Sequence, residues 1–127
     1  MGLPIVCIDF DGVLHSYSSG WQGADLANDP PVPGAIEWLT ALYEGGQVQP
    51  VIYSSRSRQD GGIRCMKDWL IRHGMPVELA DNIGFPVTKP AAFLTIDDRA
   101  ICFEGNFGGL TADALLAFKP WNKRGAA

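Results

Sequence analysis

The chain has 127 residues, 46% of them hydrophobic, which is enough for one domain with a single buried core and argues against disorder. A formal net charge of −4 and a pI near 4.9 exclude a general basic surface for nucleic acid. No apolar run is long enough to cross a bilayer, and the N-terminal segment lacks the features of a signal peptide. Three widely spaced cysteines predict reduced core thiols in a cytoplasmic protein: Cys7, Cys65 and Cys102. We therefore expect one domain over residues 1–127, with no membrane contact.

The first third of the chain predicts a strand, a long flap and a helix. Residues 3–9, LPIVCID, form a nearly continuous apolar run, which is typical of a strand buried on both faces. Residues 12–33 are rich in Gly, Ser, Asn, Asp and Pro and are too long for a turn, which indicates a functional loop. Tyr17 and Trp21 favour an ordered flap there. The helix predicted within 30–46 has apolar residues at helical spacing: Ile36, Leu39, and Leu42 or Tyr43.

The rest of the chain alternates in the same way. Residues 47–55, QVQPVIYSS, predict a second strand, and 91–97, AAFLTID, predict a third buried strand that ends in acid. Residues 100–105 are expected to form a short fourth strand. A final helix is predicted over 111–119, with its first residue, a threonine, as the cap. The helix between the second and third strands, predicted over 61–73, has this inner stripe: Ile63, Met66, Trp69 and Leu70.

Strands that alternate with helices imply parallel pairing through right-handed crossovers. The predicted fold is therefore a three-layer α/β/α sandwich with a mainly parallel, Rossmann-like sheet. In such sheets ligands bind beyond the carboxyl ends of the strands, near the switch in strand order. Polar residues follow each of the three strands at that edge, which is difficult to attribute to packing: Asp9 and Asp11, Ser54, and Asp97 and Asp98.

Several carboxylates on one rim repel one another unless a cation neutralises them. Oxygen ligands suit Mg²⁺, and the lack of histidine and cysteine at these positions argues against zinc. Asp9 beside Mg²⁺ could attack phosphorus to form an aspartyl-phosphate, and Asp11 could handle the proton of the leaving alcohol and then of water. Ser54 and Lys89 would hold and neutralise the phosphoryl oxygens as charge shifts.

Four motifs in this order, DFDGV, YSSR, TKP and FLTIDD, resemble those of the haloacid dehalogenase (HAD) superfamily of phosphohydrolases and cover residues 5–98. The resemblance implies that Asp9 is the nucleophile and Asp11 the general acid/base. It also implies that Ser54 is the small hydroxyl residue and Lys89 the lysine of the family. A HAD-like fold and a phosphatase activity are what we expect from it.

The same resemblance implies a metal site. In the family, Mg²⁺ is held by the side chain of the first aspartate, the backbone carbonyl at the second, and a carboxylate of the acidic pair. These positions are Asp9, Asp11, and Asp97 or Asp98 in this chain. Asp97 is assigned as the direct ligand and Asp98 as its partner.

Five other residues lie near the expected site or the chain end, and three of them, Arg56, His15 and Trp21, have two interpretations each. Ser55 is the alternative to Ser54 as the hydroxyl residue. Arg56 could meet a second anionic group of the substrate or be a solvated charge. His15 and Trp21 lie in the flap, where they could contact substrate or only pack. Trp121 is expected to cover the final helix.

Many HAD members carry a large cap domain in intervals that are short here, so the chain resembles the minimally capped members. An open site admits bulky phosphorylated substrates, such as macromolecule ends, unless a homo-oligomer supplies a lid. The alternatives are a small-molecule or nucleotide phosphatase and a polynucleotide end-phosphatase, for which the acidic pI gives no general support. A receiver-like phosphate-accepting domain is a non-enzyme alternative. In such a domain the phosphorylated aspartate would lie at the end of a middle strand, where this chain has YSSR instead. A catalytically silent binding module is another non-enzyme alternative. Such a module would be expected to have lost one of Asp9, Asp11 and Lys89, and this chain has all three.

Overall fold

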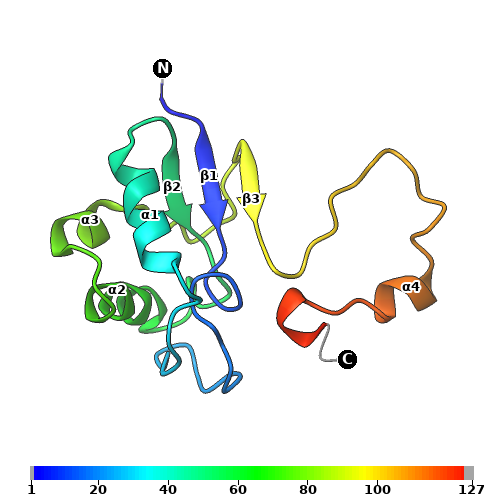
Figure 1. Cartoon of the computed structure of the whole chain (residues 1–127), viewed down its shortest axis with the longest axis horizontal. Coiled ribbons are helices and arrows are strands. Elements are labelled where there is room, and N and C mark those ends of the chain that lie inside the picture. The colour runs from blue at the N-terminus through cyan, green and yellow to red at the C-terminus, as the bar shows by residue number, and fades with distance from the viewer. Residues whose placement is uncertain (1, 125–127) are drawn as a thin grey trace.

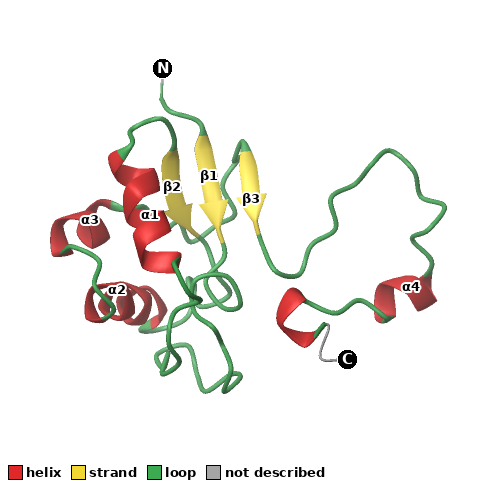
Figure 2. Ribbon diagram, viewed as in Figure 1, coloured by secondary structure: helices red, strands yellow, loops and turns green. Residues whose placement is uncertain are grey.

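Strand β1 (Ile5–Ile8) is the centre of a three-stranded parallel sheet in the computed structural model, which describes residues 2–124. Strands β2 (Gln49–Ile52) and β3 (Leu94–Ile96) pair with it on either side (Figure 1). The parallel α/β prediction is thus confirmed. Figure 2 shows α1 (Ala35–Glu44), α2 (Gly62–Arg72) and α3 (Val77–Asn82) on one side of the view, and α4 (Ala112–Leu116) away from the sheet on the other. A 3₁₀ turn, η1 (Trp121–Lys123), follows α4.

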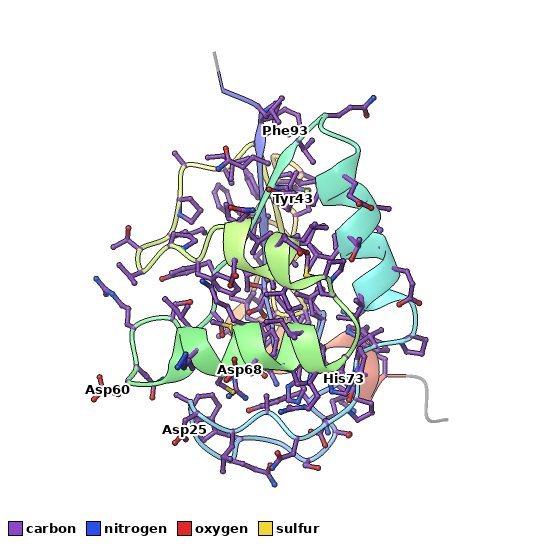
Figure 3. All side chains as sticks on the ribbon, turned by 90° about the vertical axis from the view of Figure 1, so that its left-hand side faces the viewer. Asp25, Tyr43, Asp60, Asp68, His73 and Phe93 are labelled. Atoms are coloured by element: carbon purple, nitrogen blue, oxygen red, sulfur yellow. The ribbon has the colours of Figure 1, made fainter. Side chains whose placement is uncertain are left out.

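The core joins one face of the sheet to α1 and α2. Val6 and Ile8, which share a face because strand side chains alternate, belong to one buried cluster with the helix residues. Figure 3 shows the side chains that fill this space. The predicted helical stripes are correct, because Ile36 and Leu39 of α1 are buried, as are these residues of α2: Met66, Trp69 and Leu70.

Proline is compatible with β2 because of the register. Gln49 and Tyr53 donate their N–H groups to the β1 segment, whereas Ile52 donates outward to the carbonyl of Gly84, at 2.9 Å. Pro50 lies two residues before Ile52, so its nitrogen also faces away from β1. The lack of an N–H group on Pro50 therefore removes no hydrogen bond between β1 and β2.

The strand order places a switch point beside β1. The chain passes from β1 to β2 on one side and returns to β3 on the other. In open α/β sheets such a reversal leaves a crevice beyond the carboxyl ends of the diverging strands. The ends of β1 and β3 therefore form a natural position for a ligand.

The C-terminal part of the chain differs from the prediction. Residues 100–105 form no strand, and β3 is a short edge strand with Leu94 exposed rather than a buried one. Helix α4 begins at its predicted cap, where Thr111 Oγ1 accepts the Ala114 N–H at 3.2 Å, but it buries none of its residues. The predicted second helical layer is therefore not formed by α4, and Figure 1 shows this segment leading away from the sheet.

Two smaller differences concern helix α3 and the cysteines. Helix α3 was not predicted, because six residues after Pro76 are too few to show a helical period. Cys102 is exposed and Cys65 only half-buried, so Cys7 is the one thiol of the three in the core as predicted. Within residues 2–124, none of the helices is long and apolar enough to cross a bilayer.

Candidate active site

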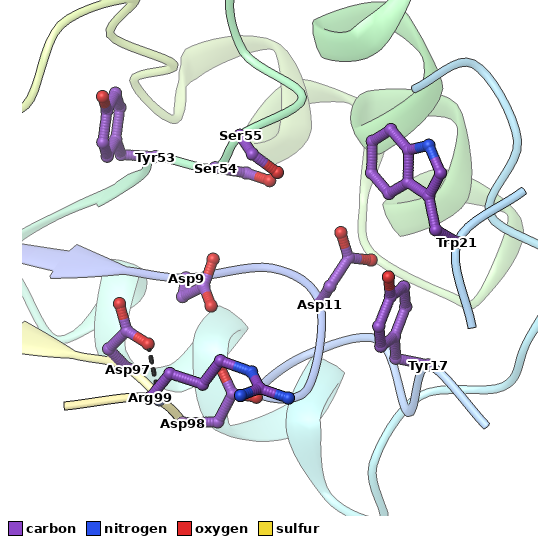
Figure 4. Close-up of a pocket in the computed structure, with 10 residues that line it drawn as sticks. All are labelled: Asp9, Asp11, Tyr17, Trp21, Tyr53, Ser54, Ser55, Asp97, Asp98 and Arg99. Carbon is purple, nitrogen blue, oxygen red and sulfur yellow. Dashed lines mark hydrogen bonds between the residues drawn. The ribbon is translucent and has the colours of Figure 1, made fainter. Parts of the chain in front are cut away.

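A cavity of about 350 Å³ lies at the carboxyl end of the sheet. Residues that follow each strand line it, together with Tyr17 and Trp21 from the flap (Figure 4). The strands contribute the following residues: Asp9 and Asp11 after β1, Tyr53, Ser54 and Ser55 after β2, and Asp97, Asp98 and Arg99 after β3. The structure therefore brings the strand-end residues together at one edge, as the sequence predicts.

Asp9 is half-buried at the first position after β1. Its Oδ1 accepts the N–H of Phe10 at 2.9 Å, and the Phe10 ring points into the core with no exposure. Burial, a hydrogen-bond contact with Asp98 and the charge of Asp97 together raise the pKa of Asp9 to about 8. The carboxylates therefore destabilise one another, and a cation among them would remove that repulsion.

The acidic residues are placed to share such a cation. Asp9, Asp97 and Asp98 each offer one carboxylate oxygen, and these oxygens all lie within 4.8 Å of one another. The donors are oxygen alone, which fits a hard divalent cation. Asp97 is exposed, and its Oδ1 accepts the N–H of Arg99 at 2.8 Å. Asp11, whose carboxylate is engaged elsewhere, does not belong to this group.

Gly12 makes room for the acidic group. Its φ of 85° lies in the left-handed region, and a Cβ built on it would overlap the Asp98 carboxylate. The chain turns at once after Asp11, so that Leu14 and His15 donate their N–H groups back to the carbonyl of Phe10, at 3.0 Å each. The glycine therefore serves both the turn and the approach of Asp98.

Asp11 is fixed by two side chains, those of Arg56 and His15. Arg56 binds its carboxylate in a bidentate pair, with Nε to Oδ2 at 2.9 Å and Nη2 to Oδ1 at 3.1 Å. His15 Nδ1 lies 2.8 Å from the same Oδ1. Since His15 Nε2 accepts the Asp29 N–H at 3.1 Å, Nδ1 carries the proton and donates it to Asp11.

These contacts set the charge of Asp11. Burial raises its pKa, but the hydrogen bonds from His15 and Arg56 and the positive charge of Arg56 outweigh burial. The net pKa of Asp11 therefore lies below its ordinary value. At neutral pH the Asp11 carboxylate is therefore ionised.

Arg56 also holds the flap. Its guanidinium is fully buried, and Nη1 donates to three flap carbonyls, those of Gly23, Ala24 and Leu26, at 2.8 to 2.9 Å. The prediction of Arg56 as a substrate contact or a solvated charge is wrong, because the strand-end turn directs it inward. His15 had two interpretations, substrate contact and packing, and the structure agrees with packing: the side chain is only 1% exposed and stacks on Phe10, with ring centroids 5.3 Å apart.

Of the other predicted site residues, Ser54, Ser55 and Trp21 line the cavity and Lys89 does not. Ser54 is buried and its Oγ accepts the Arg56 N–H at 3.1 Å, while Ser55 is exposed at the cavity wall. Trp21 covers Arg56, with the guanidinium carbon 4.9 Å from its ring centroid, and about half of it faces solvent. Lys89 is exposed and does not line the cavity.

Arg99 is a lining residue that sequence analysis missed. It directly follows the acidic pair, so its place after a strand end was the available signal. Lys89 and Arg99 therefore differ in this structure: only Arg99 brings a positive charge to the cavity wall. The Lys89 charge is near enough to Cys7 to offset part of the rise that burial causes in the thiol pKa.

Searches with this chain against protein-family models, curated protein sequences and solved structures found no match.

Proposed function

We propose that the chain is a Mg²⁺-dependent phosphatase of the HAD type, which hydrolyses a phosphate monoester through an aspartyl-phosphate on Asp9. One observation carries this proposal: Asp9 is half-buried on a cavity at the end of β1, and its carboxylate approaches those of Asp97 and Asp98. Structural packing gives no reason to gather three carboxylates at a sheet edge, whereas phosphoryl transfer requires a nucleophile beside a cation.

In the first step an Asp9 oxygen forms a bond to phosphorus as the bond from phosphorus to the ester oxygen breaks. Asp11, in its protonated form, gives its proton to the departing oxygen. In the second step water attacks the aspartyl-phosphate, the bond from phosphorus to Asp9 breaks, and the Asp11 carboxylate accepts the proton of water. The two steps release one alcohol and one phosphate and return Asp11 to its protonated form.

The contacts of Asp11 suit the second step best. Arg56 and His15 favour the ionised carboxylate, which is the form that takes a proton from water. They also hold the carboxylate in one orientation, which general base catalysis needs. Protonation of the leaving group is the step that this arrangement assists less.

The phosphoryl oxygens have two partners in the cavity. Ser54 Oγ accepts a backbone N–H, so its hydroxyl hydrogen is available to a phosphate oxygen. Arg99 supplies positive charge, and Lys89 would join it only after a movement of its side chain. Mg²⁺, held by Asp9, Asp97 or Asp98 and the Asp11 carbonyl, would neutralise phosphoryl charge when bound.

The test is hydrolysis of para-nitrophenyl phosphate with and without Mg²⁺. We expect turnover that needs Mg²⁺ and a loss of at least about a thousandfold in kcat for Asp9→Asn. Asp68→Asn, an exposed aspartate of α2, is the matched control and should retain wild-type activity. Absence of turnover by the wild type across a panel of phosphate esters would refute the phosphatase, and full activity of Asp9→Asn would refute the nucleophile.

A further inference from the structure

A second cavity, of about 280 Å³, adjoins the first. The two share Tyr17, Asp98 and Arg99 in their linings, so a ligand in one lies beside a ligand in the other. The second cavity adds flap residues on one side and the C-terminal turn η1 on the other. It is therefore an extension of the candidate active site.

The C-terminal turn is attached to the site by one specific bond. Trp121 Nε1 donates to the carbonyl of Gly12 at 2.7 Å, across 109 residues of sequence. Sequence analysis placed Trp121 on the final helix and did not indicate this contact with the turn after β1. This bond sets Asn122 and Lys123 on the cavity wall, and the turn is closed by the Lys123 N–H, which donates to Pro120 at 2.9 Å.

The opposite wall is also held in place. Ser19 donates both its N–H and its hydroxyl to the carboxylate of Asp29, at 2.8 and 2.6 Å. Asp29 in turn is connected to Trp69 of α2, whose Nε1 donates to its carbonyl at 2.9 Å. Both walls of the cavity are therefore fixed by hydrogen bonds to the rest of the molecule.

The charges of this cavity favour an anion. Arg99 and Lys123 line it, and within residues 2–124 neither cation forms an ion pair. Its one carboxylate, that of Asp98, belongs to the acidic group around Asp9. The chain has a net charge of −4, so two unpaired positive side chains beside the candidate active site stand out against its overall negative charge. Guanidinium and ammonium groups together are typical phosphate-binding partners.

We propose that this second cavity binds a second phosphate group of the substrate, through Arg99 and Lys123. The inference rests on the proposed phosphatase function and narrows its substrate to phosphate monoesters that carry another phosphate. That second group can be the other phosphate of a nucleoside bisphosphate or the first phosphodiester of an oligonucleotide end. The shared chemistry is a phosphate anion adjacent to the one that is hydrolysed.

The experiment compares kcat/KM for a nucleoside 5′-monophosphate, the corresponding 3′,5′-bisphosphate and a 5′-phosphorylated dinucleotide. The wild type should prefer one of the doubly charged substrates by about tenfold or more, the equivalent of one charge-assisted contact. Preference for the bisphosphate identifies a small molecule, and preference for the dinucleotide identifies an oligonucleotide end. Lys123→Gln should reduce the preference to about twofold or less. Lys119→Gln, an exposed lysine outside the cavity, should leave it unchanged.

Equal kcat/KM for all three substrates, or a preference that survives in Lys123→Gln, would overturn the second phosphate site. Failure of the phosphatase itself is recognised separately, by the absence of turnover of para-nitrophenyl phosphate. In that case titration calorimetry with the bisphosphate decides: about tenfold weaker binding by Lys123→Gln supports the site, and equal binding refutes it.

Discussion

Replacement of Arg56 by methionine should destabilise the fold by about 3–5 kcal/mol and strongly reduce the proposed phosphatase activity. The guanidinium has no solvent exposure and forms a bidentate pair with Asp11, whose side chain is 13% exposed. Methionine would fill much of the volume but would leave the Asp11 carboxylate without its cation. It would also leave three flap carbonyls without a donor.

The size of the effect follows from burial. A comparable pair at the surface contributes about 0–1 kcal/mol, but removal of one partner from a buried pair leaves an uncompensated charge and costs about 3–5 kcal/mol. Each carbonyl that lost its donor without gaining water would add about 1–3 kcal/mol, which flap movement can relieve. Since small domains are stable by about 5–15 kcal/mol, Arg56→Met should still fold at low temperature. Urea unfolding followed by circular dichroism measures the difference.

Two variants separate this cause from others. Arg58→Met changes an exposed arginine two residues away and should cost less than about 0.5 kcal/mol. Asp11→Asn combined with Arg56→Met should be less destabilising than the sum of the single changes, because the carboxylate no longer needs its partner. A cost below about 1 kcal/mol for Arg56→Met, or strict additivity in the double variant, would contradict the role of the buried pair.

Two further predictions concern the acidic group. Gly12→Ala should destabilise the fold by about 1–3 kcal/mol more than Gly20→Ala, and should weaken Mg²⁺ binding in calorimetry. Both glycines have positive φ, but only at Gly12 would a methyl group meet the Asp98 carboxylate. Equal losses of stability in the two variants would contradict this role of Gly12. Without metal, Asp9, with its pKa raised to about 8, retains in the folded state a proton that the unfolded chain releases near pH 4. The stability that Asp9 itself contributes is therefore fully present below pH 4 and is lost as pH rises toward 8. Urea unfolding in EDTA should therefore show Asp9→Asn gaining on the wild type by at least about 1 kcal/mol between pH 5 and 8, and parallel profiles would refute the shift.

Local sequence was sufficient to predict the residues that follow the strands. The first buried apolar run ends at Asp9, and parallel strands bring their carboxyl ends to one edge of the sheet. Asp9, Ser54 and Asp97 could therefore be grouped without any tertiary information. Helices α1 and α2 were predictable for a similar reason, since their apolar residues repeat with the helical period. The segment at 100–105 was not, because an apolar run forms a strand only where a neighbouring strand offers a partner, and here no strand pairs with the outer edge of β3 within residues 2–124.

The burial of the Arg56 side chain could not be predicted from the flanking sequence, because arginine is mostly exposed in proteins and the partner of Arg56, Asp11, is 45 residues away in the chain. A signal did exist in the flap. A 22-residue loop with few regular hydrogen bonds needs donors for any carbonyl that it buries, and the strand-end arginine, with five N–H groups, lies next to the site that this loop covers. The two aspartates of the DFD motif therefore depend on different parts of the chain. Asp9 is placed by the sheet, whereas Asp11 is placed by the flap through Arg56 and His15. Flap substitutions should accordingly slow hydrolysis of the proposed aspartyl-phosphate, in which the Asp11 carboxylate takes a proton from water, more than its formation. Rapid-quench detection of the phosphorylated enzyme can separate the two steps.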